Sequence, residues 1–395
     1  MAASKRFLLV GSLLRPESLQ KYNREIENRD DITYPFYDDL EGYQEVEDQA
    51  VRQIVQQQLD AGLPEISDGE FSRSIWHLDF FWGMEGVDRY IADQGWLFQE
   101  KTEDSCEQSH FETRRDIGLR VTGPVHSKNH EFIKHYKRVK DLAPADVDVK
   151  LTIPAPAQIY SELSAQFSAG GDYSHDVYET PKALREGLVA AWKEFIDEFV
   201  AADGEILQMD DCTWTKFSED NPHGLYSDGD ITEEEIKETA QHYVEINNQV
   251  IDYAHKKGLK VYTHNCRGNY ASRGFTGGSY ENIAQYFLAN QNYDRFYLEW
   301  DDTRAGNISA LSAFKDKPET EVVVGFLSSK LSDLDDEEEV LEELEEAAKY
   351  VAKDNLYLSH QCGFASCDGG NELTQDQQWD KIKQGQEIAR KFWGE

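Results

Sequence analysis

The stretch "VYTHNCRGNY" (residues 261–270) decides how the rest of the chain is interpreted. Val261, Tyr262 and Thr263 favour a strand, and the chain turns polar directly after His264 and Cys266. The stretch therefore predicts a strand, LKVYTH (259–264), with two residues able to bind a metal ion at and just after its end. A buried cysteine also packs as a small hydrophobic residue, so the pair alone leaves both interpretations open.

Seven other short apolar runs predict further strands. They are RFLLVG (6–11), PEISDG (64–69), VKLTIP (149–154), EILQMD (205–210), RFYLEW (295–300), EVVVGF (321–326) and NLYLSH (355–360). Amphipathic segments with helical period lie between them, the longest at 45–63, 182–202 and 232–258. Alternating strands and helices predict a parallel α/β sheet, and eight strands predict a closed (β/α)8 TIM barrel. We expect residues 1–395 to form one such domain.

Residues 71–148 interrupt this alternation and are rich in Phe, Trp and His, with one strand-like run, LRVTGPV, at 119–125. The segment is too long for an ordinary connection, so we expect an excursion after the second strand that forms a lid over the barrel mouth. The aromatic cluster at 74–86 fits the lining of that mouth and the packing of a core equally well.

The acidic composition excludes some classes of partner. The chain has 40 Lys and Arg against 76 Asp and Glu, a formal net charge of −36, which repels nucleic acid and anionic membranes. The negative charge fits an adaptation to salt and an adaptation to low cytoplasmic pH equally well. The acidic run at 333–352 carries its apolar residues on one helical face, so we interpret it as a solvated helix.

The apolar residues and cysteines indicate a cytoplasmic protein. The N-terminal run FLLVGSLL (7–14) is short and leads directly into Arg15 and Pro16, which indicates a strand and not a signal sequence. No run approaches the ~18 to 20 apolar residues that cross a bilayer. Five cysteines without a secretory signal favour a reducing compartment.

Chemically competent residues gather at the predicted strand ends, which meet at one mouth in a TIM barrel. Four of them are His264, Cys266, Glu299 and Cys362. Nitrogen, sulfur and oxygen donors of this kind suit a tetrahedral Zn²⁺ ion. An exchangeable carboxylate from Glu299 would let an incoming thiol bind the metal as a thiolate, whereas a free thiol with a pKa of about 8.5 is mostly protonated at neutral pH.

Motifs along nearly the whole chain resemble the catalytic C-terminal barrel of cobalamin-independent methionine synthase. They are VGS (10–12), DGE (68–70), LTIPAPAQIY (151–160), LQMDD (207–211), THNC (263–266), YLEWDD (297–302), VVVGF (322–326) and SHQCG (359–363). The sequence is most similar to the shorter, single-barrel paralogues of that enzyme.

The resemblance implies a role for each matching residue. His264, Cys266, Glu299 and Cys362 match the zinc ligands that activate the sulfur of homocysteine. Glu70 and Asp210 match the two carboxylates that hold the amino group of homocysteine. The backbone of Val10, Gly11 and Ser12 matches the segment that receives its carboxylate. Tyr160 stands where a family tryptophan stacks near the folate. Arg15 is a candidate partner for the substrate carboxylate because it lies just beyond the Gly11-Ser12 turn.

Three departures from the family pattern concern the methyl donor. The full-length enzyme has two barrels and this chain has room for one, so the barrel that helps to hold a polyglutamate tail is missing. Lys330 stands near the position of a histidine thought to protonate the folate, which a lysine would do only with a lowered pKa or as an electrostatic stabiliser. The usual Asp-Glu-Pro ending is replaced here by Asp210-Asp211-Cys212.

The sequence therefore predicts a zinc-dependent methyltransferase that makes methionine from homocysteine. The donor is 5-methyltetrahydrofolate or a related methylated compound. A zinc hydrolase on the same fold and a barrel that binds zinc or an amino acid without turnover are the alternatives. The sequence leaves open whether the chain forms a homodimer.

Overall fold

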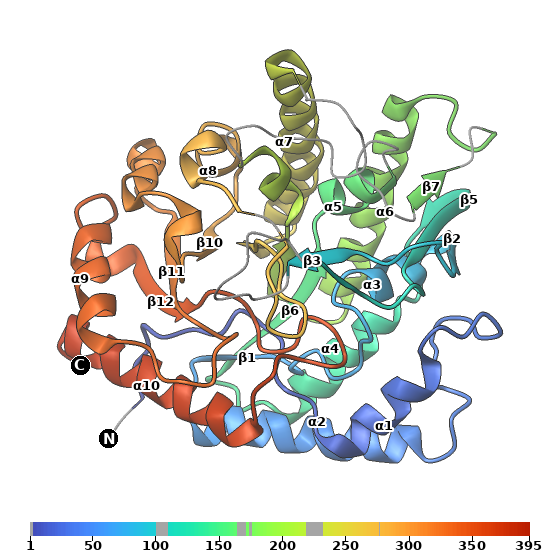
Figure 1. Cartoon of the computed structure of the whole chain (residues 1–395). Helices are drawn as coiled ribbons and strands as arrows, with labels where there is room; N and C mark the ends of the chain where they lie inside the picture. Colours follow the sequence, from blue (N-terminus) through green and yellow to red (C-terminus); the bar gives the residue numbers. More distant parts are fainter. Residues whose placement is uncertain (1–2, 100–109, 164–170, 174–175, 219–231, 276) are drawn as a thin grey trace.

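The computed structural model describes residues 3–99, 110–163, 171–173, 176–218, 232–275 and 277–395, and its centre is a curled, parallel sheet (Figure 1). Seven strands pair in the order β1-β6-β8-β9-β10-β11-β12. Their bounds are β1 Glu65–Ile66, β6 Asp148–Pro154, β8 Ile206–Asp210, β9 Lys260–Asn265, β10 Arg295–Glu299, β11 Glu321–Leu327 and β12 Leu356–His360. All seven lie within runs predicted from the sequence or within one residue of them.

The segment predicted as the first strand, 6–11, closes the ring but forms only a single β-bridge, between Phe7 and Leu358 of β12. Two carbonyl groups of this segment accept hydrogen bonds from side chains inside the barrel and not from a neighbouring strand. The Leu9 carbonyl accepts from Lys150 Nζ at 2.6 Å, and the Val10 carbonyl accepts from Gln208 Nε2 at 3.0 Å. The fold is therefore the predicted TIM barrel, with its first strand reduced to one bridge.

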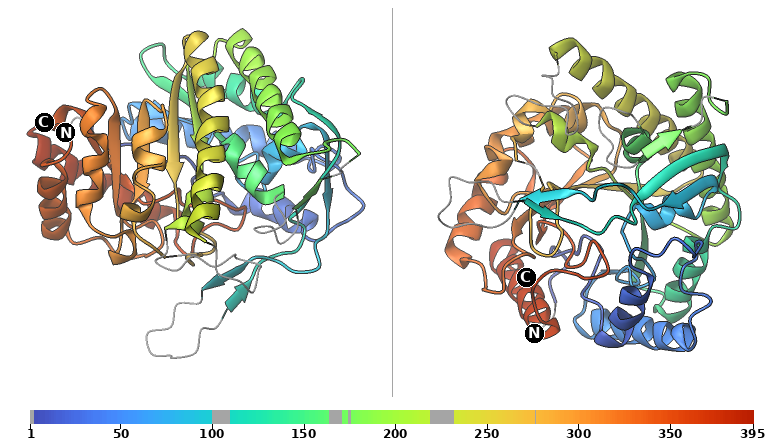
Figure 2. Two further views of the ribbon diagram at one scale, coloured as in Figure 1. Left: turned by 90° about the horizontal axis from the view of Figure 1, so that it is seen from above. Right: turned by 45° about the vertical axis from the view of Figure 1, so that its right-hand side comes forward.

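Helices follow the strands and cover the outside of the sheet (Figure 2). The α-helices are α1 Glu17–Ile26, α2 Tyr43–Asp60, α3 Leu78–Trp82, α4 Glu131–Leu142, α5 Pro156–Leu163, α6 Pro181–Ala201, α7 Glu233–Lys256, α8 Phe287–Asn290, α9 Glu337–Ala347 and α10 Gln375–Trp393. Short 3₁₀ helices are η1 Thr213–Phe217, η2 Tyr280–Asn282, η3 Thr303–Ala305, η4 Ile308–Asp316 and η5 Lys353–Asn355. Thr180, Thr232 and Thr374 cap α6, α7 and α10 through their side chains.

The acidic run forms α9, as predicted, with Val340, Leu344 and Ala347 buried against the barrel. None of the helices in the described ranges is both long enough and apolar enough to cross a membrane.

Two small sheets lie beside the barrel mouth, and the excursion after β1 supplies all of their strands except β7, which follows α5. One pairs β2 (Glu85–Tyr90), β5 (Gly118–His126) and β7 (Gly171–Tyr173), and the other is the hairpin of β3 (Leu97–Gln99) and β4 (His110–Glu112). Figure 1 shows β3 lying across the ring of barrel strands. The excursion is shorter than the predicted 71–148, because its last part, α4, packs on α2 and β6 as an outer helix.

A charged network occupies the interior of the barrel below the mouth. Glu65 accepts from Arg295 Nη1 at 3.0 Å and from the Tyr297 hydroxyl at 3.0 Å, and lies 3.1 Å from Lys150 Nζ. Burial acts to raise the pKa of Glu65, but the two cations outweigh it and lower that pKa below its ordinary value. This carboxylate therefore stays charged inside the barrel and compensates two buried cations.

Candidate metal and substrate site

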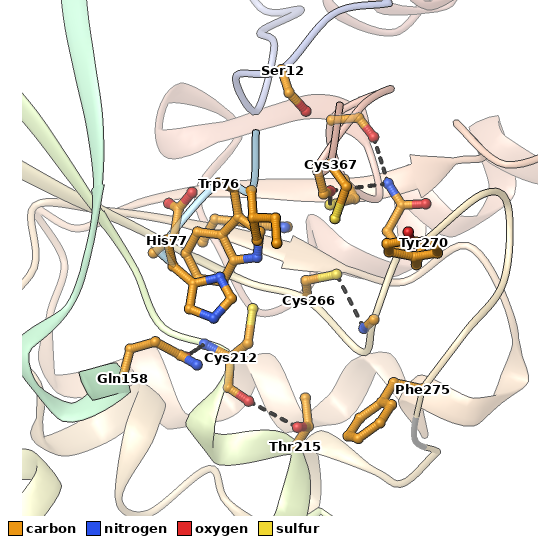
Figure 3. A pocket seen from close by; sticks show the side chains of 18 of the residues that line it. Ser12, Trp76, His77, Gln158, Cys212, Thr215, Cys266, Tyr270, Phe275 and Cys367 are labelled. Carbon is orange, nitrogen blue, oxygen red and sulfur yellow. Dashed lines mark hydrogen bonds between the residues drawn. The ribbon is translucent and has the colours of Figure 1, made fainter. Parts of the chain in front are cut away.

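An open cavity lies where the carboxyl ends of the barrel strands meet, as expected for this fold (Figure 3). The strands and the segments directly after them contribute Val10, Ser12, Glu70, Asp210, Cys212, His264, Cys266 and Cys362 to its lining. Most of the residues predicted from the sequence as zinc or homocysteine ligands therefore face one space.

Three of the four predicted metal ligands are brought together. One donor atom each of His264, Cys266 and Cys362 lie within 4.8 Å of one another, and all three residues are buried. The Nδ1 atom of His264 lies 3.2 Å from the Tyr297 carbonyl, which fixes the ring and makes Nδ1 the protonated nitrogen. The Nε2 atom is buried and has no hydrogen-bond partner among the described residues. An imidazole held in this way is typical of a metal-binding histidine.

The thiols of this cluster are unfavourable as anions unless a cation is present. The pKa of Cys266 is raised well above its ordinary value, mainly by its hydrogen bond to the Cys212 thiol. The pKa of Cys362 is raised likewise, first by its hydrogen bond to Cys266 and then by burial. A divalent cation reverses this effect because it binds thiolates directly. One imidazole nitrogen and two thiols in this space fit Zn²⁺.

Glu299, the fourth predicted ligand, ends β10 but does not join the cluster. Its Oε1 atom accepts from Lys330 Nζ at 2.7 Å, and its Oε2 atom accepts from the Arg267 backbone N–H at 2.5 Å. Burial acts to raise the pKa of Glu299, but Lys330 and Arg267 lower it to about 2. In this arrangement both carboxylate oxygens are bound by protein donors.

Lys330 is buried and lies outside the lining of the cavity. Burial acts to lower its pKa, but Glu299 and Asp301 outweigh burial and raise it above the ordinary value of 10.5. A lysine with a raised pKa is a weak proton donor at neutral pH. Of the two roles that the sequence left open, this favours the electrostatic one.

The two predicted carboxylates, Glu70 and Asp210, both line the cavity and are buried. The Thr152 hydroxyl donates to Glu70 Oε1 at 2.7 Å, and Gln208 Nε2 donates to Asp210 Oδ1 at 2.8 Å. Glu70 has a φ of 62°, a left-handed conformation that is uncommon for a residue other than glycine. Burial, and then the nearby Glu70, raise the pKa of Asp210 well above its ordinary value. Glu70 already pairs with the buried Arg73, whose Nη1 lies 3.3 Å from Oε1, and an ammonium group between the two carboxylates would reduce their repulsion further.

Val10 and Ser12 border the same part of the cavity, and the backbone around them lies close to other segments. A Cβ atom on Gly11 would lie 3.1 Å from Glu70 Oε1, and one on Gly363 would lie 2.0 Å from Ser12 Oγ. The Ser12 hydroxyl accepts from the Ala365 N–H at 3.2 Å. The N-terminal segment and the Cys362 loop are thus packed directly against each other.

Three predicted binding residues are absent from the cavity lining, namely Gly11, Arg15 and Tyr160. The Arg15 guanidinium is buried and donates to four backbone carbonyls, those of Glu70, Arg73, Ala365 and Cys367. It would have to give up these bonds to bind a substrate carboxylate, so in this structure it joins two loops. Tyr160 is buried on α5, and its hydroxyl accepts from Arg185 Nη1 at 2.8 Å.

The structure adds Cys212 and an aromatic wall to the residues expected from the sequence. Cys212 lines the cavity, although no chemical role for it could be inferred from the sequence. The wall consists of Trp76, His77, Trp96, Phe98, Tyr270 and Phe275. Of these residues, the sequence indicated only those in the aromatic cluster at 74–86. That cluster serves two purposes, because Trp76 and His77 line the cavity whereas Phe80, Phe81 and Trp82 are buried in the core.

Comparison with known proteins finds relatives over nearly the whole chain. No model of a protein family matches the chain. The uncharacterized protein YxjH of Bacillus subtilis is 32% identical over 388 residues, which cover 97% of this chain and 93% of YxjH. Its relative YxjG is 31% identical over 385 residues, with the same coverage.

Among solved structures, the putative vitamin-B12 independent methionine synthase of Listeria monocytogenes is 25% identical, with a TM-score of 0.70. The match covers 100% of this chain and 99% of that protein. A B12-independent methionine synthase of Shewanella sp. W3-18-1 shares the fold, with a TM-score of 0.69 at 20% identity over 99% of this chain and 98% of that one. The chain therefore belongs to the same family as YxjH and YxjG, shares its fold with cobalamin-independent methionine synthases, and is a methyltransferase-like enzyme.

Proposed function

We propose that this protein is a zinc-dependent methyltransferase that transfers a methyl group to the thiol of homocysteine and releases methionine. One observation carries the proposal. The cluster of His264, Cys266 and Cys362 shares a cavity with Glu70 and Asp210, a pair of carboxylates suited to an ammonium group. A metal-binding end and an ammonium-binding end in one cavity match the two ends of a thiol-bearing amino acid.

The protein's own residues orient the acceptor. Glu70 and Asp210 bind the ammonium group, and Val10 and Ser12, on either side of Gly11, border the space for the carboxylate. His264, Cys266 and Cys362 would hold the zinc ion, which supplies a Lewis acid that keeps the thiol deprotonated at neutral pH. Catalysis then consists of thiolate activation and alignment with the donor.

Glu299 and Lys330 control access to the metal in this proposal. With its carboxylate bound to Lys330 and to the Arg267 N–H, Glu299 leaves the three-donor cluster open to an incoming thiol. Lys330 thus acts by positioning Glu299, the ligand expected to exchange with the substrate.

Replacing Lys330 with methionine is expected to raise the KM for homocysteine about tenfold, since the released Glu299 carboxylate would compete with the thiol. Lys330→Arg, which keeps the charge, is the matched control and should stay close to the wild type. Steady-state kinetics and zinc content measure the effect. Equal KM values for wild type and Lys330→Met, at equal zinc content, would contradict the positioning role.

The affinity for methionine is expected to rise with pH. Asp210 has a raised pKa, so it is protonated at low pH, and an ammonium group binds its carboxylate form. The affinity should therefore fall as the pH decreases through that raised pKa. Calorimetric titrations between pH about 5 and 8 would show the rise, and Asp210→Asn should bind weakly with a flat profile. The same slope in both proteins would show that another group controls binding.

The proposal as a whole is tested by incubating the zinc-loaded protein with homocysteine and a set of methylated donors. Methionine from at least one donor, dependent on zinc and on homocysteine, is the expected result. A protein that binds zinc and homocysteine but forms no methionine with any of them would be a binding protein and not a methyltransferase.

A further inference from the structure

The cavity has an unusual charge for a site whose methyl donor would be an anionic folate. Among the residues that the structure describes, its lining contains the carboxylates of Glu70, Glu162 and Asp210 and no lysine or arginine. Glu70 and Asp210 belong to the homocysteine end. Glu162, on α5, is a third carboxylate in the same lining, with 18% of its side chain exposed.

Aromatic rings line the rest of the cavity on two sides (Figure 3). On one side, the His77 ring lies 4.4 Å from the Trp76 ring and 5.6 Å from the Trp96 ring, measured between centroids. On the other side, the Phe98 ring lies 5.4 Å from Tyr270 and 5.1 Å from Phe275. Four of these residues are only partly buried and thus present surface to a ligand; they are Trp76, Trp96, Tyr270 and Phe275.

His77 gives independent support for a ligand at this wall. The residue is 4% exposed, and neither ring nitrogen makes a hydrogen bond with any part of the chain that the structure describes. Its Nε2 atom lies 3.4 Å from Glu162 Oε1. Buried polar groups normally have partners, so an unsatisfied imidazole that lines a cavity marks a place where a bound molecule is expected to make contact.

We propose that the donor is a small methylated onium compound, which carries its methyl group on a positively charged sulfur or nitrogen. This inference rests on the proposed function. Aromatic faces attract such cations, and the Glu162 carboxylate adds a favourable charge. A polyglutamylated folate would instead bring several carboxylates to a lining that offers no cation among the described residues and one further carboxylate.

The transfer balances without another reactant. The homocysteine thiolate attacks the methyl carbon, a carbon–sulfur bond forms, and the bond from that carbon to the onium atom breaks. The bonding electron pair stays on the departing sulfur or nitrogen, which leaves as a neutral thioether or tertiary amine group. The thiol proton passes to solvent when the thiolate forms. Loss of the positive charge weakens the hold of the aromatic wall on the product and favours its release.

The test compares donors in the presence of the zinc-loaded protein and homocysteine deuterated on its carbon chain. Mass spectrometry then distinguishes methionine made from homocysteine from methionine released by a donor. The sulfonium arm uses S-methylmethionine and dimethylsulfoniopropionate, the ammonium arm uses glycine betaine, and the anionic arm uses methyltetrahydrofolate with one or three glutamates. Methylcobalamin forms a fourth arm.

Labelled methionine from a sulfonium or from betaine, and none above background from the folates, is the expected result, and the arm that reacts identifies the onium atom. Turnover with a folate or methylcobalamin but not with an onium compound would overturn this inference and leave the proposed methyltransferase intact. Failure with every donor would count against the proposed function itself.

Variants of the wall add a second readout. Trp96→Leu is expected to raise the KM for the onium donor about tenfold, and Glu162→Gln about fivefold. The KM for homocysteine and the zinc content should not change. Glu342→Gln, which removes an exposed charge on α9 outside this cavity, is the control. Unchanged donor KM values in both wall variants would place the donor elsewhere.

Discussion

Cys362→Ser is expected to lower the affinity for zinc by about 100-fold or more and to abolish methionine formation. The Cys362 thiol is one of three donors that lie within 4.8 Å of one another, and a hydroxyl is a far poorer zinc ligand than a thiolate. Zinc content after dialysis against a chelator, measured beside the unfolding transition, separates loss of metal from loss of fold.

Cys367→Ser is the matched control for this experiment. Cys367 is also a buried cysteine that lines the cavity, five residues further along the same loop, but it lies outside the donor cluster. This variant should keep its zinc. A Cys362→Ser protein with a full complement of zinc and normal turnover would show that the ligands have been misassigned.

Glu65→Ala is expected to lower the free energy of unfolding by about 3–5 kcal/mol. The substitution leaves Lys150 and Arg295 buried without the carboxylate that lies 3.1 Å and 3.0 Å from their nitrogens. The pKa of Glu65 is lowered from 4.5, so its contribution is present above pH 4.5 and is lost as the pH falls through the lowered pKa. Chemical denaturation at neutral and acidic pH measures both effects.

Glu321→Ala provides the comparison for the buried network. Glu321 also pairs with Arg295, at 2.6 Å, but 29% of its side chain is exposed. Its removal should cost about 1 kcal/mol or less. An equal loss of unfolding free energy in the two variants would show that the buried carboxylate of Glu65 stabilises the fold no more than the partly exposed one of Glu321.

The barrel could be predicted from the sequence because its strands are short, strongly apolar and separated by amphipathic helices. The seven strands of the sheet carry this signal in their own residues. The segment 6–11 carries it too, yet forms one bridge, and two of its carbonyls accept hydrogen bonds from the side chains of Lys150 and Gln208 instead of from backbone donors. These hydrogen bonds depend on tertiary contacts, which a local pattern does not contain.

The site, too, has parts that follow from the sequence pattern and parts that depend on tertiary contacts. His264, Cys266, Glu70 and Asp210 could be placed in one cavity because strand ends meet in a barrel. The engagement of Glu299 by Lys330 could not be foreseen, since it depends on side-chain positions.

Other parts of the site follow from how loops and helices pack. Trp96 and Phe98 line the cavity although they belong to the excursion, far in sequence from the strand ends. Arg15 and Tyr160 were expected at the substrate site, but their polar groups are engaged by backbone carbonyls and by Arg185.

X-ray absorption at the zinc edge, recorded with and without homocysteine, tests the account most directly. Two sulfur neighbours and one imidazole nitrogen are expected from the protein, and one more sulfur should appear when homocysteine binds. An unchanged number of sulfur neighbours with homocysteine bound would show that the metal does not activate the acceptor thiol.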